Sequence, residues 1–221
     1  GEEASFIVMV DGEHVLPMAT SQDHKRASNG DVGPNTGGMG AYSPAPVVDE
    51  EIHNRIMDEV IYPTVRGMAA EGNHYIGFLY AGLMIAADGA PKVIEFNCRF
   101  GDPETQPILL RLKSDLVAHC LSALSGNLDQ ETASWDPRSA VGVVLAAGGY
   151  PGHYQGGNVI TGLSDAVEDE HQKVFHAGTK SLGGQVVTAG GRVLCATAMG
   201  DSVSEAQAQA YRLASKIDWE D

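Results

Sequence analysis

Two oxygen-bearing side chains follow an apolar stretch near the middle of the chain. Glu95 and Asn97 lie two residues apart in the sequence KVIEFNCRFGDPETQ, which runs from Lys92 to Gln106. Strand-forming residues surround them, and residues two apart in a strand project from the same face. A carboxylate and an amide carbonyl are hard ligands of the kind that Mg²⁺ takes, with phosphate and water completing its shell. As a metal site, such a short pair suits a nucleotide site better than a structural metal cage.

Three charged side chains decide how this pair is interpreted. A glutamate and an asparagine at a strand end are usually only a polar edge, but Arg99, Asp102 and Glu104 follow within seven residues. A glycine and a turn-locking proline lie among them. Such groups are costly to crowd beside a buried strand unless they serve a site. The segment therefore predicts a binding or catalytic site.

Four motifs, spread over nearly the whole chain, resemble those of a single enzyme family. They are QDHKR at Gln22–Arg26, GPNTGGMGAYSP at Gly33–Pro44, GFLYAGLM at Gly77–Met84 and the EFNCRFGDPETQ stretch. The family is that of the phosphoribosylamine–glycine ligases, or glycinamide ribonucleotide synthetases, which are ATP-grasp enzymes of purine biosynthesis. The resemblance is to their carboxy-terminal part. It implies that the amino-terminal substrate domain and the lobe that covers the nucleotide are absent from this sequence.

The resemblance implies a reaction and a set of ligands. ATP, glycine and 5-phosphoribosylamine would give glycinamide ribonucleotide, ADP and phosphate through glycyl phosphate, with Mg²⁺ or Mn²⁺ as the metal. Phosphoryl transfer needs positioning and charge neutralisation more than a protein nucleophile. The expected residues are Lys25, Arg99 and Asp23 for catalysis, Gly37, Gly38, Met39, Gly40, Asp102 and Glu104 for substrate binding, Glu3 and His24 for nucleotide binding, and Glu95 and Asn97 for the metal.

These residues have distinct expected roles. Lys25 and Arg99 would counter the charge of phosphoryl groups or of the glycine carboxylate, while Asp23, Asp102 and Glu104 would order the amine or ribose hydroxyls. The glycines of the GPNTGGMGAYSP motif would let backbone N–H groups approach a ligand closely. One departure from the family pattern matters for the metal. Many ATP-grasp enzymes carry an acidic ligand on the preceding strand, but residues 77–85 contain no carboxylate, so phosphate, water or a residue elsewhere must complete the shell.

Two other functions remain open. One is another ATP-grasp carboxylate–amine ligase that uses a different acid, against which the glycine-rich motif and the CRFGDPETQ segment weigh. The other is a non-catalytic binding fragment, because without the covering lobe a nucleotide would be held on one side only. We expect little or no ligase activity and no tight ATP binding from these 221 residues alone.

Composition narrows the possible partners and the compartment. The net charge of −15 argues against nonspecific nucleic-acid binding, which needs a positive surface. In so acidic a chain the few cations matter more, and Lys25, Arg26 and Arg99 are candidates for holding phosphate. No stretch is apolar enough to cross a membrane. The odd count of three cysteines argues against a disulfide framework. We expect a cytoplasmic protein with no membrane partner, monomeric as the full-length enzyme.

The fold class expected is α/β (α+β), with two domains. Residues 1–124 would form the carboxy-terminal ATP-grasp lobe, an antiparallel sheet with flanking helices. Residues 125–137 are polar and contain Gly126 and Pro137, which is typical of a linker. Residues 138–221 would form a small mixed α/β domain.

Periodicity and turn residues predict most elements. Hairpins are expected for 5–19 through Asp11-Gly12 and for 75–97 through 87–90. Helices are expected from Asp49 until Pro63 kinks or ends them, from Thr105 to Leu124, and after the capping box Ser202–Glu205. Later strands are expected at 140–147, 173–177, 185–188 and 192–199, the last two joined by a hairpin turn at 189–191. No regular element is expected at 27–46, which is interpreted as a ligand-covering loop.

Three smaller features have plain structural interpretations. Cys98 is expected to be a small buried residue and not a nucleophile. His176 is expected to pack between domains. The segment Gly148–Gly152 is expected to be a turn, because no phosphate-loop pattern accompanies it.

Overall fold

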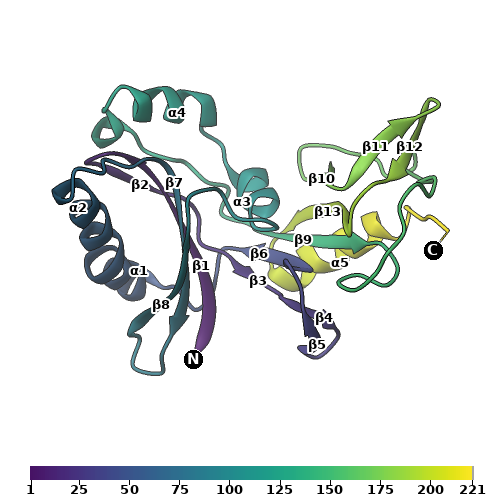
Figure 1. Cartoon of the computed structure of the whole chain (residues 1–221), viewed down its shortest axis with the longest axis horizontal. Coiled ribbons are helices and arrows are strands. Elements are labelled where there is room, and N and C mark those ends of the chain that lie inside the picture. The colour runs from purple at the N-terminus through teal and green to yellow at the C-terminus, as the bar shows by residue number, and fades with distance from the viewer. Residues whose placement is uncertain (221) are drawn as a thin grey trace. The chain divides into compact units, whose positions relative to one another are not determined.

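The computed structural model describes residues 1–220 of the chain, which divide into two compact units. Unit 1 consists of Gly1–Gln22, Pro44–Gly101 and Leu112–Asp136, and unit 2 consists of Asp23–Ser43, Asp102–Arg111 and the residues from Pro137 onward. Both contain antiparallel sheets with a few helices (Figure 1), so the predicted α/β (α+β) class is confirmed. No helix in the described residues is long and apolar enough to span a membrane.

Unit 1 is built on a four-stranded sheet of order β2-β1-β7-β8. Its strands are β1 (Glu2–Asp11), β2 (Val15–Pro17), β7 (Ile76–Ile85) and β8 (Pro91–Asn97), and each neighbouring pair is antiparallel. Eight of the ten residues of β1 are buried, because it is a central strand with helices over both faces. Both predicted hairpins, β1–β2 and β7–β8, are confirmed.

One face of this sheet packs against a continuous helical segment made of α1 (Glu50–Ile56), the π-helical turn η1 (Met57–Ile61) and α2 (Tyr62–Ala70). Alternate apolar residues of β1 and β7 meet the apolar stripe of these helices, which buries both surfaces. The core consists mainly of Phe6, Val8, Val10, Ile56, Val60, Ile61, Leu79 and Leu83. Asp49 caps the first helix, as predicted, by accepting the Ile52 N–H.

Pro63 does not end the helical segment, which runs on to Ala70, but the regular α-helix gives way to a π-helical turn just before it. The helix continues because a π-helical turn precedes the proline, in which the Tyr62 N–H bonds to the Met57 carbonyl. A proline cannot donate to the carbonyl four residues back and its ring clashes with it, and a wider turn relieves that clash. The Thr64 hydroxyl then donates to the Val60 carbonyl at 2.7 Å.

The predicted helix from Thr105 to Leu124 is two helices, α3 (Thr105–Arg111) and α4 (Leu116–Leu124). The break lies at residues 112–115, where Leu112 bridges to Trp135 and Asp115 caps the second helix. The first helix belongs to unit 2, and α4 belongs to unit 1, where it covers the sheet face opposite α1 and α2. The apolar spacing runs across the break, so periodicity alone could not show it.

The sheet of unit 2 has the order β10-β13-β9-β6-β3. Its strands are β3 (Gln22–Asp23), β6 (Gly40–Ser43), β9 (Ser139–Ala146), β10 (Gln172–His176) and β13 (Arg192–Gly200). Helix α5 (Val203–Ala214) packs on one face, against Leu194, Ala196 and Ala198 of β13. The opposite side chains of β13 include Cys195 and Thr197, on the side where Pro107 of α3 lies close to Gly142. Because side chains alternate along β13, one face of the strand packs against α5 and the other faces α3.

Two small ribbons complete unit 2. The first, β4 (Arg26–Ser28) with β5 (Val32–Asn35), and strand β6 lie in the stretch 27–46 where no regular element was expected, so that prediction was wrong. In the second, β12 (Gln185–Thr188) pairs with β11 (Thr179–Leu182), which the sequence did not predict. The expected hairpin between β12 and β13 is therefore also wrong, because β13 pairs with β9 and β10.

The start of α5 follows the predicted capping box closely. The Ser202 side chain accepts the Glu205 N–H, while the Glu205 carboxylate accepts the N–H of Asp201, one residue before the cap. The remaining short element is the 3-10 turn η2 (Leu128–Gln130) in unit 1. The predicted turn at Gly148–Gly152 is confirmed by a Gly152 N–H bond to the Gly149 carbonyl.

Candidate active site

Glu95 and Asn97 lie at the end of β8, on the edge of the sheet of unit 1. The register shifts between Gly82 and Leu83, so Glu95 pairs with Gly82 while Leu83 pairs with Val93. A Cβ atom at Gly82 would lie 3.2 Å from Glu95 Cγ, so the glycine leaves room for the glutamate. The two metal-ligand candidates remain two residues apart beyond this bulge and share a face, as their spacing predicted.

The hydrogen-bonding capacity of this pair is not used within the protein. Glu95 is exposed and has no hydrogen bond or ion pair to any residue in the described part of the chain. The Nδ2 atom of Asn97 is buried and has no hydrogen-bond partner. Buried polar groups nearly always have a partner, so an unpartnered amide here points to a missing ligand or water.

The side-chain oxygen atoms of Glu95 and Asn97 fit Mg²⁺ in chemistry and in number. A carboxylate and an amide supply oxygen ligands, and Mg²⁺ takes few protein ligands when phosphate and water supply the rest. Among residues 1–220 no group of three or more His, Cys, Asp or Glu side chains could hold a metal by itself. A site here would depend on ligand oxygens from a nucleotide.

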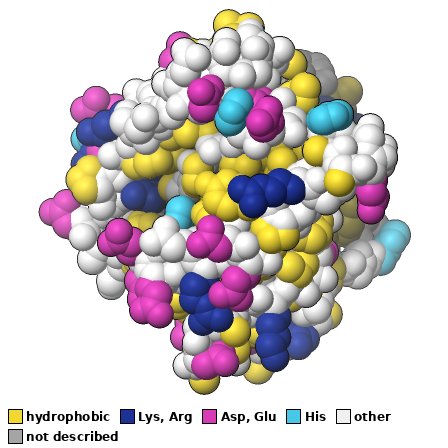
Figure 2. All heavy atoms as spheres, turned by 90° about the vertical axis from the view of Figure 1, so that its left-hand side faces the viewer, with side chains coloured by type: hydrophobic (Ala, Val, Ile, Leu, Met, Phe, Trp, Pro, Cys, Tyr) yellow, Lys and Arg dark blue, Asp and Glu magenta, His cyan; other side chains and the backbone are white. Residues whose placement is uncertain are grey.

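The strand carrying this pair is more exposed than expected. The prediction assumed a buried strand, but Val93, Ile94 and Phe96 are 44%, 49% and 42% exposed, and β8 is the edge strand of its sheet. On the face shown in Figure 2, which is the left-hand side of Figure 1, apolar side chains gather near the middle with acidic side chains scattered around them. Part of the apolar surface of unit 1 is thus not buried within the chain.

The turn after β8 is organised by aromatic contacts. Phe100 packs on Phe78 with ring centroids 4.8 Å apart, and Arg99 donates to the Phe100 carbonyl at 2.9 Å. The Tyr75 hydroxyl donates to the Phe78 carbonyl, and its pKa is raised to about 12 by burial and by the neighbouring Cys98. Cys98 is exposed, so its predicted burial was wrong. Arg99 is exposed as well, which leaves most of its guanidinium available.

The glycine-rich motif lies in unit 2, and its backbone N–H groups already have partners. The Gly37 N–H donates to the Tyr150 hydroxyl and the Gly38 N–H to the Thr36 hydroxyl, both at 3.0 Å. The Met39 N–H donates to a backbone carbonyl at 2.7 Å. These three N–H groups therefore bond within the protein.

Close packing explains these glycines instead. Gly38 has φ +110°, and a Cβ there would lie 2.4 Å from Pro103 Cδ. A Cβ on Gly40 would lie 2.6 Å from the Gly142 carbonyl oxygen in the neighbouring strand. Each position excludes a side chain because backbone or a rigid ring lies where the side chain would be. The glycines thus let this segment approach its neighbours.

His24 and Met39 line a cavity of about 660 Å³ inside unit 2. The cavity lies beside the β4–β5 ribbon, strands β6 and β9 and helix α5, with Val141, Val143 and Val144 among its apolar lining. The His24 ring lies 5.6 Å from the Tyr42 ring, and its backbone N–H donates to the Gly40 carbonyl. His24 is exposed, so its ring is accessible to a ligand.

Asp102 and the glycine-rich motif are joined by Arg192, a residue that the sequence did not suggest. Arg192 Nη2 donates to Asp102 Oδ2 at 3.0 Å, and Nη1 donates to the carbonyl of Gly37 at 2.6 Å. The only signal was the general one that cations matter in so acidic a chain. That signal did not separate Arg192 from the other basic residues.

The other predicted residues have varied environments. Glu104 is 2% exposed, so it does not face solvent. Asp23 and Lys25 are half-buried in unit 2, where the Lys25 carbonyl accepts the Thr36 N–H and hydroxyl. Glu3 is exposed on β1 in unit 1, and its carbonyl accepts the Gln22 side chain at 2.8 Å. Its side chain is therefore open to solvent near the start of the strand.

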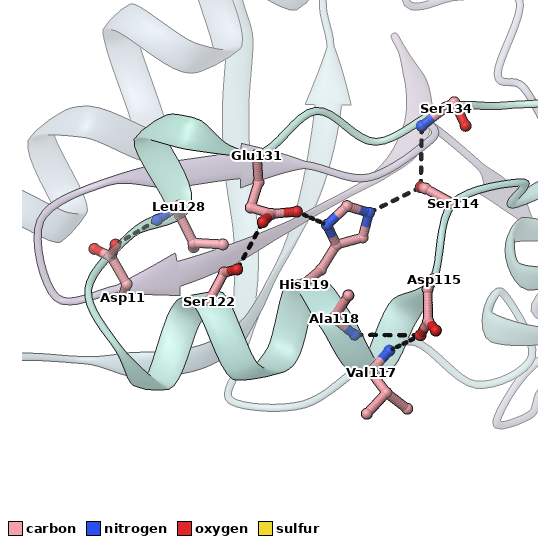
Figure 3. A network of polar contacts seen from close by, with 10 residues as sticks. All are labelled: Asp11, Ser114, Asp115, Val117, Ala118, His119, Ser122, Leu128, Glu131 and Ser134. Carbon is pink, nitrogen blue, oxygen red and sulfur yellow. Dashed lines mark hydrogen bonds and ion pairs between the residues drawn. The ribbon is translucent and has the colours of Figure 1, made fainter.

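A buried polar network lies in unit 1, away from any predicted residue (Figure 3). His119 Nδ1 is 2.5 Å from Glu131 Oε2, and its Nε2 is 2.8 Å from Ser114 Oγ. Ser122 donates to the other Glu131 oxygen at 2.6 Å, and Ser114 Oγ accepts the Ser134 N–H. Hydrogen bonds from Ser122 and then His119 lower the pKa of Glu131.

Serine, imidazole and carboxylate follow one another here as in a hydrolase triad. The network nevertheless closes on protein groups, since Ser114 Oγ is engaged by His119 and by a backbone N–H, and the His119 side chain is 4% exposed. Its contacts connect α4 to the segment that follows it. We therefore assign it a structural role.

Two other predicted or potentially reactive side chains have structural explanations. His176 is exposed and bonds to the Thr179 hydroxyl at 2.9 Å, so its predicted packing between domains was wrong. Cys195 is buried in unit 2, which raises the pKa of its thiol to about 11. Its thiolate is therefore disfavoured as a nucleophile.

Comparisons with known proteins agree with the sequence motifs. The family model "Phosphoribosylglycinamide synthetase, ATP-grasp (A) domain" matches residues 1–105, and "Phosphoribosylglycinamide synthetase, C domain" matches residues 140–221. Together the two matches cover the chain except for residues 106–139, which lie between them. The chain belongs to the phosphoribosylglycinamide synthetase family. The resemblance to phosphoribosylamine–glycine ligases is thereby confirmed.

Relatives from this family are similar over the whole chain. Proteins named phosphoribosylamine–glycine ligase from Vibrio vulnificus and Pseudomonas aeruginosa are 71% identical over 220 residues and 73% identical over 219 residues, covering 100% and 99% of the chain. The crystal structure of the phosphoribosylamine–glycine ligase from Thermotoga maritima has a TM-score of 0.87 and 38% identity, and the match covers 100% of this chain and 54% of that one. The chain spans 51% of the length of both curated relatives.

Proposed function

We propose that the protein to which this chain contributes is an ATP-dependent ligase that joins glycine to 5-phosphoribosylamine. The products would be glycinamide ribonucleotide, ADP and phosphate, formed through glycyl phosphate in purine biosynthesis. The observation that carries this proposal is the identity of about 70% to relatives of that name along the whole chain. The exposed carboxylate of Glu95 supports it, because the metal of a bound nucleotide would take it as an oxygen ligand.

In this proposal Glu95 and Asn97 hold Mg²⁺ or Mn²⁺ beside the phosphates of ATP. The metal, when bound, neutralises phosphate charge during phosphoryl transfer. Arg99, exposed at the turn after β8, pairs with a phosphoryl group or with the carboxylate of glycine. Lys25 contributes a second positive charge, and Glu3 and His24 contact the nucleotide.

The substrate-binding residues are proposed with one change of emphasis. Asp102, whose side chain is 56% exposed, accepts from amine or hydroxyl groups, and Asp23 does the same. The buried Glu104 is better suited to support the site than to contact substrate. Gly37, Gly38, Met39 and Gly40 shape the wall of the site through their close packing.

The wider organisation is proposed on the same basis. Residues 1–124 act as the carboxy-terminal ATP-grasp lobe, residues 125–137 as a linker, and residues 138–221 as the small following domain. We propose a cytoplasmic, monomeric full-length enzyme whose partners are its small-molecule substrates. The three cysteines are all free thiols, which suits a reducing compartment.

The decisive experiment measures ADP release with ATP, Mg²⁺, glycine and phosphoribosylamine. It uses this chain and a version extended by the upstream half found in the relatives. We expect turnover only by the extended protein and only when both substrates are present. ADP release by the extended protein with a different acid in place of glycine would contradict the substrate assignment. No ADP release by either protein would favour a non-catalytic binding fragment.

A further inference from the structure

Arg192 holds together two chain segments of unit 2 that carry predicted substrate-binding residues. It lies at the start of β13, and its side chain is 21% exposed. Its Nη1 lies 2.6 Å from the Gly37 carbonyl oxygen, 3.3 Å from that of Gly38 and 3.1 Å from that of Asp102. Its Nη2 donates to Asp102 Oδ2 at 3.0 Å. One guanidinium thus fixes the glycine-rich segment and Asp102 relative to each other.

The geometry requires an arginine and not merely a positive charge. A guanidinium is planar and carries donors on separate nitrogen atoms, so it can reach a carboxylate with one nitrogen and carbonyl oxygens with another. A lysine ammonium is a single point with three rotatable donors, and it cannot reproduce this planar arrangement. Gly37 makes the approach possible, because a Cβ there would lie 3.0 Å from the Arg192 guanidinium carbon.

The contact leaves half of the Asp102 carboxylate available. Arg192 uses Oδ2, and Asp102 has no hydrogen bond from its Oδ1 within the described residues. The side chain is 56% exposed, so this second oxygen can accept from a bound molecule. Arg192 also cancels the charge of the carboxylate, which favours neutral donors such as an amine or hydroxyl group and makes a nearby phosphate less unfavourable.

We propose that Arg192 is a positioning residue for 5-phosphoribosylamine, which it serves by aiming Asp102 at the amine or ribose hydroxyls of that substrate. This inference rests on the proposed ligase function. Of the two small substrates, phosphoribosylamine matches the site because it combines neutral donors with a phosphate. The ammonium group of glycine would instead prefer a carboxylate whose charge is not already paired.

The test compares variants of the extended enzyme by steady-state kinetics with each substrate varied in turn. Arg192→Met removes the guanidinium and keeps an apolar stem, and Arg192→Lys keeps the charge. Arg212→Met is the matched control, because Arg212 is an exposed arginine on α5 of the same unit. We expect Arg192→Met to raise KM for phosphoribosylamine about tenfold or more, with kcat and KM for glycine and ATP changed less than about threefold. Arg192→Lys should recover only a small part of the loss, and the control should match the unmodified enzyme.

A second variant keeps the inference testable if Arg192→Met does not fold. Asp102→Asn retains the backbone carbonyls that Arg192 binds and should raise the same KM without lowering the melting temperature. An unchanged KM for phosphoribosylamine in folded variants overturns the inference, and so does an equal loss in all kinetic constants, which would indicate general distortion. If the unmodified extended enzyme does not use phosphoribosylamine at all, the proposed function itself fails, and this outcome is distinguishable because it needs no variant.

Discussion

Unit 1 contains two polar regions that differ in how completely their hydrogen bonds are satisfied. Around His119, both ring nitrogens, both Glu131 oxygens and the Ser114 hydroxyl have protein partners. At the end of β8, Glu95 is exposed and has no hydrogen bond or ion pair to another described residue, and the buried Nδ2 of Asn97 has no hydrogen-bond partner. The polar groups around His119 are all satisfied within the protein, which we call the closed region, whereas those at the end of β8 are not, which we call the open region.

This difference separates a structural network from a candidate ligand site. A buried polar group without a partner costs stability, so a protein retains one where a ligand supplies the partner or where other interactions compensate. A satisfied network instead restrains the chain segments that it connects. Residue types alone would have misled, because serine, histidine and glutamate are the more familiar catalytic set.

The largest expected effect concerns the open region. Glu95→Gln in the extended enzyme should slow ADP formation about 100-fold or more, the scale on which loss of one group that stabilises charge slows a reaction. Its melting temperature should stay within about 1 °C, because Glu95 supports no contact that the fold needs. Glu71→Gln, at another exposed glutamate of unit 1, is the control. Undiminished turnover at saturating Mg²⁺ would remove Glu95 as a metal ligand.

The closed region should show the opposite behaviour. His119→Leu leaves Glu131 and Ser114 without their shared partner, which should lower the free energy of unfolding by about 1–3 kcal/mol. Urea denaturation followed by tryptophan fluorescence measures this change, since Trp135 lies next to the Ser134 contact of the network. His74→Leu, at an exposed histidine, should have little effect.

Kinetics of the same variant provide the complementary check. In the extended enzyme, His119→Leu should keep KM for every substrate within about twofold, because a structural network acts on stability and not on binding. A selective loss of turnover in a fully folded His119→Leu protein would contradict the structural assignment. The contrast between the two regions would then disappear.

A smaller effect is expected from pH at the contact between β1 and the segment after α4. Burial acts to raise the pKa of Asp11, but N–H groups of His14, Glu13 and Leu128 and the His14 ring outweigh it, so that pKa lies below its ordinary value of 3.8. The hydrogen bond to Asp11 raises the pKa of His14 above 6.5. The stability that Asp11 contributes is therefore present above pH 3.8 and is lost as the pH falls through its lowered pKa. The stability that His14 contributes is complete below pH 6.5 and is lost as the pH rises through its raised pKa.

The measurement is the free energy of unfolding from pH 3 to pH 8 for the unmodified chain and for Asp11→Asn. The difference between them should be greatest between the two pKa values and should shrink towards both ends of the range. Asp58→Asn, at an exposed carboxylate of the same unit, should follow the unmodified chain throughout. A difference that does not change with pH would show that the charge of Asp11 contributes nothing.

Local chemistry was the part of the fold that could be predicted. Asp49 and Ser202 were identified as helix caps, and both accept backbone N–H groups three residues ahead. Such interactions involve near neighbours, so the sequence contains all their participants. Helix breaks and strand pairing were predicted less well. Leu112 ends a helix by bridging to Trp135, and β12 pairs with a polar strand that periodicity did not reveal.

The candidate site shows the same division between near and distant partners. That Glu95 and Asn97 share a face could be predicted, because two-residue spacing in a strand fixes it. Arg192 could not, because it reaches Asp102 and Gly37, which are 90 and 155 positions away in the chain. The partner of the Gly37 N–H could not be predicted for a similar reason, since it is the hydroxyl of Tyr150, far along the chain.

The sequence by itself determined the family, the α/β class and the placing of Glu95 and Asn97 together at the end of β8, because these depend on residue types in short, ordered motifs. Only the tertiary structure decided which polar groups are satisfied and which remain open. A hydrogen bond depends on distance and burial, and both arise when segments far apart in the chain fold together. His119 was thereby made structural, while Glu95 and one oxygen of Asp102 were left open to ligands.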